Sequence, residues 1–297
     1  MTQVNPTSLF YTIMEYPLPN EQVMKFLYWW KRDDNSLIQD AFHYSPNQCD
    51  LYSRHGSPSE IFNEYIDHIN KTCYLWKHIP YVTHVYLANS ITFNALHDRS
   101  DIDLLIIVKP GRLWIARLMS WFILWIFWLS RIGKRSVKKY CLSFYLEESP
   151  KSNLYSLLLQ PLDLYMIFWL AHLVPLYAIS AKEADFIWKS NIRLKSYLPN
   201  HPLKQIIHLG NILQVGKSRW KEIIEIVLHN RIGNMINRTI GSIRKPIILY
   251  KKKRLGKKWR WVILSDSILK FHLDKRKEII LKYLNNIKKK ASPSTSL

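Results

Sequence analysis

Cysteine is scarce in this sequence and follows no pattern. Three of the 297 residues are cysteine, Cys49, Cys73 and Cys141, and no two of them are spaced as C-x-x-C. An odd number of scattered cysteines supports neither a disulfide framework nor a zinc site. The first residues, MTQVNPTSLF, lack the basic and then apolar regions of a secretory signal. A reducing cytoplasm is therefore the expected location.

Acidic residues are also few compared with basic ones. The chain has 22 Asp plus Glu against 43 Lys plus Arg, which gives a formal net charge of +21. Such an excess favours a polyanionic partner, which can be nucleic acid, a nucleotide or an anionic membrane surface. A chain rich in Lys, Ile and Asn can equally reflect an AT-rich genome, so the charge has a functional and a compositional explanation.

The apolar segment that follows Arg112 is too short to cross a bilayer. It is bounded by Arg112 and Arg131 and interrupted by Arg117, which leaves Leu118 to Ser130 uncharged. A bilayer span needs about 20 residues, so the segment is expected to be a helix buried against a sheet. Because it is rich in aromatic residues and flanked by bases, a peripheral membrane contact through residues 113–130 stays open as the alternative.

The expected elements alternate as they do in α/β proteins. Residues 81–88, 101–108 and 139–146 predict strands, and helices are expected over 59–79 and 113–130. With a short helix between the first two strands, this order indicates an α/β core. The rest of the pattern predicts helices at 162–177 and about 203–230, a strand at 259–264, and a final helix capped by Ser265 or Asp266.

Four regions follow from this pattern. Residues 1–58 predict a helical or winged-helix-like N-terminal module, for which two short packing helices without a DNA role are the alternative. Residues 59–149 hold the core, 150–285 a helical and basic C-terminal region, and 286–297 a disordered tail.

Asp101 and Asp103 stand two residues apart in an otherwise apolar strand. Residues at this spacing project from one face of a strand, so the two carboxylates are expected side by side. Unpaired carboxylates in an apolar strand are costly, and a hard divalent cation is a common solution. A strand end where both acids are solvated or salt-bridged is the alternative explanation.

Ser90 lies eleven residues before Asp101, after one strand and at the expected start of a short helix. Free backbone N–H groups and the helix dipole favour an anion at such a position. A phosphate there and a metal on the next strand are the two halves of a phosphoryl- or nucleotidyl-transfer centre. Asn89 and Asn94 stand where a phosphate loop is expected to carry glycine, and Asn tolerates the positive φ that such loops need.

The arrangement resembles the nucleotidyltransferase superfamily, of DNA polymerase β-like fold, in which Gly-Ser precedes Asp-x-Asp on the next strand. Further segments are similar to a group of bacterial nucleotidyltransferase-domain proteins with a winged-helix-like N-terminus: YPLPNEQV, IPYVTHVYLANS, SDIDLLIIVKPGRLWIARL, CLSFYL, LVPLY, SYLPN and LKFHLDKR. The resemblance implies an α/β (α+β) nucleotidyltransferase core with a small mixed sheet, flanked by helical regions. It implies transfer of a nucleoside monophosphate from a nucleoside triphosphate, such as ATP, to an acceptor hydroxyl on a protein, nucleic acid or small molecule.

The resemblance also implies residue roles. Asp101 and Asp103 would be the catalytic Mg²⁺ ligands, and Asn89 with Ser90 would bind the nucleotide phosphates. Superfamily members often add a third carboxylate on the following strand, where mid-strand Ser143 stands here. Glu147 is a candidate substitute as a catalytic residue, because a regular strand would place it on the face of Cys141, Ser143 and Tyr145.

Other basic residues are candidates for polyanion contacts. Lys109 and Arg112 follow the Asp-x-Asp strand and could help to neutralise a triphosphate. Residues 244–260 hold nine Lys or Arg and no acid, and Trp259 and Trp261 beside them could stack on nucleotides. A loop of solvated charge explains this cluster equally well. Two other functions therefore stay open: a catalytically impaired nucleotide-binding protein and a basic nucleic-acid-binding regulator.

Overall fold

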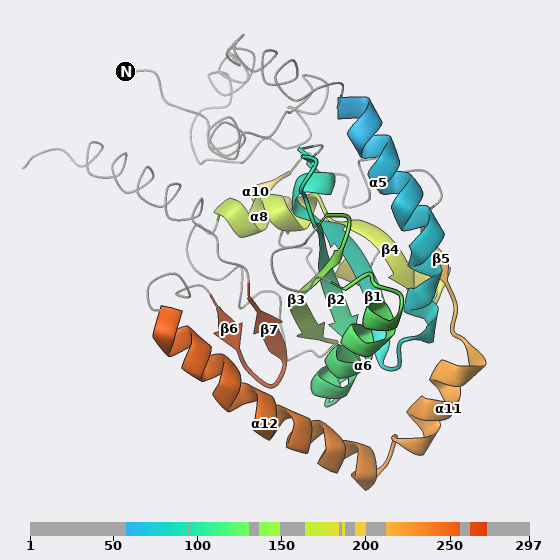
Figure 1. Cartoon of the computed structure of the whole chain (residues 1–297), viewed down its shortest axis with the longest axis vertical. Helices are drawn as coiled ribbons and strands as arrows, with labels where there is room; N and C mark the ends of the chain where they lie inside the picture. The colour runs from blue at the N-terminus through green and yellow to red at the C-terminus, as the bar shows by residue number, and fades with distance from the viewer. Residues whose placement is uncertain are drawn as a thin grey trace, which may run out of the picture.

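The computed structural model describes residues 58–93, 95–130, 137–148, 164–183, 186–187, 194–199, 212–255 and 262–271. Of the expected N-terminal module only Pro58 is among them, and both the tail at 286–297 and Asn94 lie outside them. The described part is a mixed α/β structure built on a seven-stranded sheet (Figure 1). The α/β class predicted from the sequence is confirmed.

The sheet has the strand order β5-β4-β1-β2-β3-β7-β6. β2 is parallel to β3 and β4 to β5, whereas the other neighbouring pairs are antiparallel. The strands are β1 (Val82–Ala88), β2 (Ile102–Val108), β3 (Tyr140–Glu147), β4 (Val174–Ala178), β5 (Gln214–Val215), β6 (Ile263–Leu264) and β7 (Ile268–Lys270). The three central strands lie where the sequence predicted them.

Helices cover both faces of the sheet (Figure 1). Leu105 and Ile107 of β2 pack with α8 (Leu164–Ala171) and α10 (Leu194–Tyr197). The alternate residues Leu104 and Ile106 pack with α5 (Pro58–Thr72), the 3-10 helix η3 (Cys73–His78) and α6 (Leu113–Ile126). Burial of both faces explains why β2 is apolar almost throughout rather than alternating.

Three segments predicted to be helical contain strands, and one of them is the segment at about 203–230, where β5 precedes α11. Residues 162–177 divide into α8 and β4, and β7 follows Ser265 where a helix was expected. Ser265 closes a turn instead, because its Oγ accepts a hydrogen bond of 2.9 Å from the backbone N–H of Ile268. Short apolar runs such as Val174–Ala178 fit a buried strand and a buried helix equally well, and only pairing with β1 decides.

The C-terminal part of the described chain is mainly helical. α11 (Arg219–Val227) and the long α12 (Arg231–Leu255) lie at the lower edge of the molecule in Figure 1. α12 includes residues 244–255 of the basic cluster, whereas 256–261 lie outside the described residues. Short 3-10 helices occur at η4 (Asn89–Ile91) and η5 (Ala181–Glu183).

α6 packs against the sheet, as the sequence predicted. Its side chains Leu113, Ala116 and Leu124 are buried in the core between the sheet and α5. In the part of the chain that the structure describes, no helix combines the length and the apolar character needed to span a membrane.

Two buried charged residues attach α11 to the sheet. The Glu225 carboxylate accepts hydrogen bonds from the backbone N–H of Tyr81, at 2.7 Å, and from Lys109 Nζ, at 2.6 Å. Lys221 Nζ donates to the backbone oxygen of Val82 and, at 2.9 Å, to the Tyr177 hydroxyl. Burial lowers the pKa of Lys221 to about 7, although Glu225 acts in the opposite direction. The residue is fully buried, so its protonation costs folding free energy.

This burial predicts a pH-dependent stability. The unfolded chain keeps the Lys221 proton up to about its ordinary pKa of 10.5, whereas the folded chain releases it from about 7. The free energy of unfolding should therefore rise with pH across this window, by at most about 1.4 kcal/mol per pH unit from this group. Urea denaturation of the wild type and Lys221→Met at about pH 7 and about pH 9.5 measures it. The wild type should gain stability relative to the variant at the higher pH; an unchanged difference contradicts the prediction.

Candidate metal centre

The two aspartates lie at one end of the three central strands. Asp101 directly precedes β2, and Asp103 is its second residue. Asp103 is paired with Ala88, the last residue of β1, and with Cys141 near the start of β3. The site is therefore assembled by strand pairing between segments that are distant in sequence.

Asp101, Asp103 and Cys141 form a cluster that could hold a metal ion. Each offers one ligand atom, and these atoms all lie within 4.8 Å of one another. The two aspartates are partly exposed and Cys141 is buried. Solvent therefore reaches the carboxylates, whereas the thiol closes the inner side of the cluster.

Asn89 contacts this cluster directly. It has a φ of 57°, in the left-handed region that favours glycine. Its Nδ2 donates a 2.8 Å hydrogen bond to Asp103 Oδ2, and its Oδ1 accepts one of 3.3 Å from the Tyr165 hydroxyl of α8. The expectation that Asn preserves the backbone path of a glycine agrees with this φ. The side chain has the additional effect of orienting the Asp103 carboxylate.

Ser90 follows Asn89 in a turn that is shorter than the predicted helix. η4 comprises three residues, Asn89–Ile91, and the Asn89 carbonyl accepts from the backbone N–H groups of Thr92, at 2.9 Å, and Phe93, at 3.1 Å. The Ser90 carbonyl accepts from Ala95 N–H at 2.7 Å. Asn94, the second expected glycine position, is outside the described residues.

Hydrogen bonds to the segment before β2 fix the position of Asp101. The Ser100 carbonyl accepts from the Tyr65 hydroxyl, at 2.7 Å, and from the backbone N–H of Lys138, at 3.2 Å. Burial, with a further contribution from the negative charge of Asp101, raises the pKa of Tyr65. Tyr65 therefore keeps its proton and donates to Ser100 at neutral pH.

A register shift brings Cys141, rather than the expected strand residues, to the aspartates. Asp103 pairs with Cys141, but Leu105 pairs with Phe144, so β3 has one extra residue between the two pairs. The shift puts Phe144 on the Cys141 side of the sheet and moves Tyr145 to the other side, with the α6 core. The regular alternation that would have put Glu147 on the Cys141 face does not hold.

Three other predicted site residues lie at the opposite end of β2. Lys109 forms an ion pair of 2.6 Å with Glu225 of α11. Arg112 is buried and donates to the His229 carbonyl at 2.8 Å and to the side chain of Asn234. Glu147 pairs with Val108, the last residue of β2, so the structure does not bring these three residues to Asp101 and Asp103.

Glu147 is held by the turn after β2. Its Oε1 accepts a 2.9 Å hydrogen bond from the backbone N–H of Gly111, which has a φ of 69°. Burial raises its pKa, whereas hydrogen bonds from the Gly111, Leu113 and Arg112 backbone act in the opposite direction. Glu147 thus stabilises the start of α6.

The ligand set combines hard and soft donors. Carboxylate oxygens suit Mg²⁺ and Mn²⁺, whereas a cysteine thiolate suits Zn²⁺ and other softer ions. Mg²⁺ is therefore compatible with Asp101 and Asp103, and participation of Cys141 would favour a softer ion. Cys141 was not predicted as a ligand, because its position beside Asp103 depends on the pairing of β2 with β3.

Comparisons of the chain with protein-family models, with curated proteins and with solved structures found no match.

Replacements of Asn89 test the backbone geometry of the turn. Asn89→Ala removes the bond to Asp103 and places a Cβ in a left-handed conformation without a compensating side chain. Asn89→Gly removes the same bond without that strain. The glycine variant should be more stable than the alanine variant by about 1 kcal/mol, measured by urea denaturation. Equal stabilities would mean that the φ of Asn89 is not positive in solution.

Titration with metal ions tests the cluster itself. Co²⁺ reports on its ligands, because a thiolate ligand adds a charge-transfer band in the near ultraviolet. Asp101→Asn/Asp103→Asn should weaken Co²⁺ and Mn²⁺ binding by roughly 100-fold or more. This loss is larger than the loss expected when a residue that only hydrogen-bonds to a metal ligand is replaced. Cys141→Ser should remove the charge-transfer band if the thiol is a ligand and leave Mn²⁺ binding nearly unchanged. Binding that is equal in the wild type and the double aspartate variant would exclude the cluster as a metal site.

Proposed function

We propose that this protein is a divalent-metal-dependent nucleotidyltransferase. It transfers a nucleoside monophosphate from a nucleoside triphosphate to an acceptor hydroxyl. The observation that carries the proposal is the convergence of Asp101, Asp103 and Asn89 at the common end of β1 and β2, with an Asn89–Asp103 hydrogen bond of 2.8 Å. Two carboxylates beside a turn of this kind are better explained as a site for a metal-bound triphosphate than as acids that only form ion pairs at the surface.

The roles of the residues follow from their positions. Asp101 and Asp103 would hold Mg²⁺, which when bound supplies charge neutralisation and alignment of the triphosphate oxygens. Asn89 orients Asp103 through its amide. Ser90 follows Asn89 in the same turn and would supply its hydroxyl to the phosphates. Partial exposure of both aspartates leaves room for a ligand from solvent. The acceptor oxygen forms a bond to the α-phosphorus while the bond to pyrophosphate breaks, and the acceptor proton passes to solvent or a base.

A second function, nucleotide binding without turnover, is favoured by one observation. In the described part of the chain, the third side chain in the cluster is the thiol of Cys141 and not a carboxylate. A thiol is a poor substitute for a carboxylate toward Mg²⁺. The protein would then bind a triphosphate and release it unchanged.

An assay of nucleotide transfer distinguishes these functions. The protein is incubated with cell extract, a divalent metal ion and nucleoside triphosphates labelled at the α-phosphate. Asp101→Asn/Asp103→Asn should lower labelling of an acceptor by roughly 100-fold or more, because these residues hold the metal. Asp67→Asn/Asp266→Asn is the matched control, since it removes two acids whose side chains are 63% and 84% exposed.

Each outcome has a defined meaning. Equal labelling by the wild type and the double aspartate variant would contradict the transferase proposal. Calorimetric binding of triphosphate without labelling would favour the second function, and in that case Cys141→Asp should produce labelling by restoring a third carboxylate. Absence of both binding and labelling in the presence of Mg²⁺, Mn²⁺ and Zn²⁺ would contradict both functions.

A further inference from the structure

The end of α6 exposes a group of large apolar side chains. We call this group the aromatic end of α6: Trp121 (41% exposed), Phe122 (46%), Trp125 (45%), Ile126 (49%), Phe127 (49%) and Trp128 (79%). Trp121 and Trp125 stack on each other with ring centroids 5.8 Å apart. Single exposed apolar residues are common, but a contiguous group of this size marks an interaction surface.

The neighbouring helices α11 and α12 extend the exposed apolar surface. Trp220, Ile223 and Ile226 of α11 are 55%, 55% and 74% exposed. On α12 the spacing of the exposed residues places most of them along one outer side of the helix: Ile232, Met235, Ile243, Ile247 and Tyr250. α11 buries Lys221 and Glu225 and exposes apolar side chains, the reverse of an ordinary surface helix. α12 has apolar side chains on both sides, because Ile236, Ile240 and Ile248 pack against the core.

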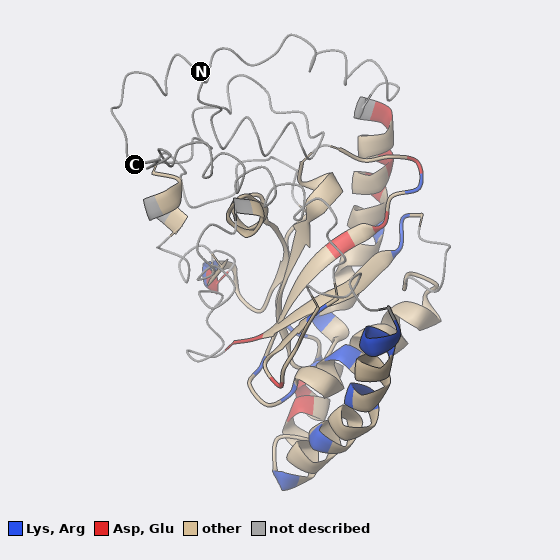
Figure 2. Cartoon of the chain, turned by 90° about the vertical axis from the view of Figure 1, so that its left-hand side faces the viewer, with Lys and Arg blue, Asp and Glu red and all other residues tan. Residues whose placement is uncertain are grey.

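Basic residues run beside the apolar side of α12. The helix has eight Lys or Arg and no acid over Arg231–Leu255, and Figure 2 shows them spread along its length. Four recur every seven residues and lie in one row: Arg231, Arg238, Lys245 and Lys252. Arg231 and Arg238 are exposed, whereas Lys245 pairs with Asp266 and Lys252 donates to the Val262 carbonyl. An apolar side with a parallel basic row is the pattern of helices that lie in the interface of an anionic bilayer.

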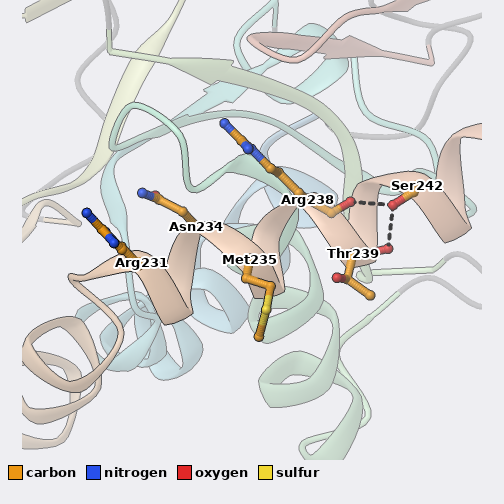
Figure 3. Close-up of a pocket in the computed structure, with 6 residues that line it drawn as sticks. All are labelled: Arg231, Asn234, Met235, Arg238, Thr239 and Ser242. Atoms are coloured by element: carbon orange, nitrogen blue, oxygen red, sulfur yellow. Dashed lines mark hydrogen bonds between the residues drawn. The ribbon is translucent and has the colours of Figure 1, made fainter.

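The same helix has an open hollow of about 350 Å³ between its basic residues. Six residues of α12 line it: Arg231, Asn234, Met235, Arg238, Thr239 and Ser242. In Figure 3 the two arginines extend to one side of the helix and Met235 to the other. Guanidinium groups next to an apolar side chain suit a phosphate headgroup with its adjoining acyl chains.

α12 packs against the first turn of α6, and the side of α6 that makes this contact continues to the aromatic end. Asn237 Oδ1 accepts hydrogen bonds from the backbone N–H groups of Trp114, at 2.9 Å, and Ile115, at 3.1 Å. A Cβ at Gly241 would approach Trp114 Nε1 to 2.8 Å, which requires glycine at this contact. Trp121 lies seven residues after Trp114 and hence on the side of α6 that faces α12.

From these observations we infer that the aromatic end of α6 and the outer side of α12 bind the surface of an anionic lipid bilayer. The contact is interfacial, because the 14 residues of α6 extend only about 21 Å against a hydrocarbon core of about 30 Å. Nucleic acid explains the basic row but not the exposed Trp, Phe and Ile side chains. The inference is independent of nucleotidyl transfer.

Sedimentation with vesicles tests the inference on the full chain. Binding is expected to vesicles of phosphatidylcholine with about 30% phosphatidylglycerol, and much weaker binding to phosphatidylcholine alone. Trp121→Gln/Trp125→Gln/Trp128→Gln should weaken binding at least about tenfold at low and at high salt. Arg231→Gln/Arg238→Gln should weaken it roughly fivefold per residue at low salt, with little effect at about 500 mM salt.

Controls separate a direct contact from misfolding and from other partners. Tyr74→Gln, which changes an exposed ring (41%) on η3, should bind vesicles like the wild type. Quenching of tryptophan fluorescence by brominated lipid should occur in the wild type and fall sharply in the triple Trp variant. Three outcomes overturn the inference: no binding to either vesicle, vesicle binding that is insensitive to the Trp replacements, or self-association or nucleic-acid binding that the Trp replacements abolish without any vesicle binding.

Discussion

The pairing of β2 with β1 on one side and β3 on the other is the constraint on which the candidate site depends. It places Asp103 between Ala88 and Cys141 and fixes Asn89 where its amide meets the Asp103 carboxylate. Two carboxylates this close repel each other, and a bound cation would reduce that repulsion in addition to the contact with the Asn89 amide. The electrostatics of the site thus follow from backbone pairing, because no single segment of the sequence contains the whole cluster.

The opposite end of β2 has a structural role. Lys109 pairs with Glu225 of α11, and Arg112 donates to the carbonyl of His229, between α11 and α12, and to Asn234 of α12. A part of the positive charge counted from composition is therefore used inside the fold, and Lys221 is fully buried. Among the described residues, exposed basic side chains are concentrated on α12, which has eight Lys or Arg and no acid of its own, although Lys245 pairs with Asp266. The net charge alone does not show which basic residues are buried or paired inside the fold and which are exposed on its surface.

Local patterns predicted the central strands, the helix α6 between β2 and β3, and the tolerance of Asn89 for a positive φ. These features depend on side-chain size, branching and backbone preference, which are properties of short segments. The sequence did not predict β4, β5, β7 or the contribution of Cys141, because each depends on a partner strand elsewhere in the chain. The extra residue in β3 also reversed the face expected for Glu147. The alternation of side chains between the two faces of a strand is reversed after a β-bulge. The sequence of β3 contains no glycine that would indicate such a bulge.

The connection between β2 and β3 relates the two surfaces of the protein. Because β2 and β3 are parallel, α6 must run back along the sheet from the end of β2 to the start of β3. Ser130 bridges Tyr140, and the Leu129 carbonyl accepts a 2.8 Å hydrogen bond from the Tyr140 N–H, so the aromatic end of α6 lies beside the start of β3. Cys141 is the next residue. The aromatic end and the aspartate cluster therefore occupy the same end of the sheet, with α6 on one face and the Asp103 side chain toward α8 on the other. α12 contacts α6 at Trp114 and Ile115, near the opposite end of β2. The lipid-binding surface inferred from α6 and α12 would therefore extend along α6 from one end of the sheet to the other, and only its aromatic end lies at the end of the sheet that holds the aspartates.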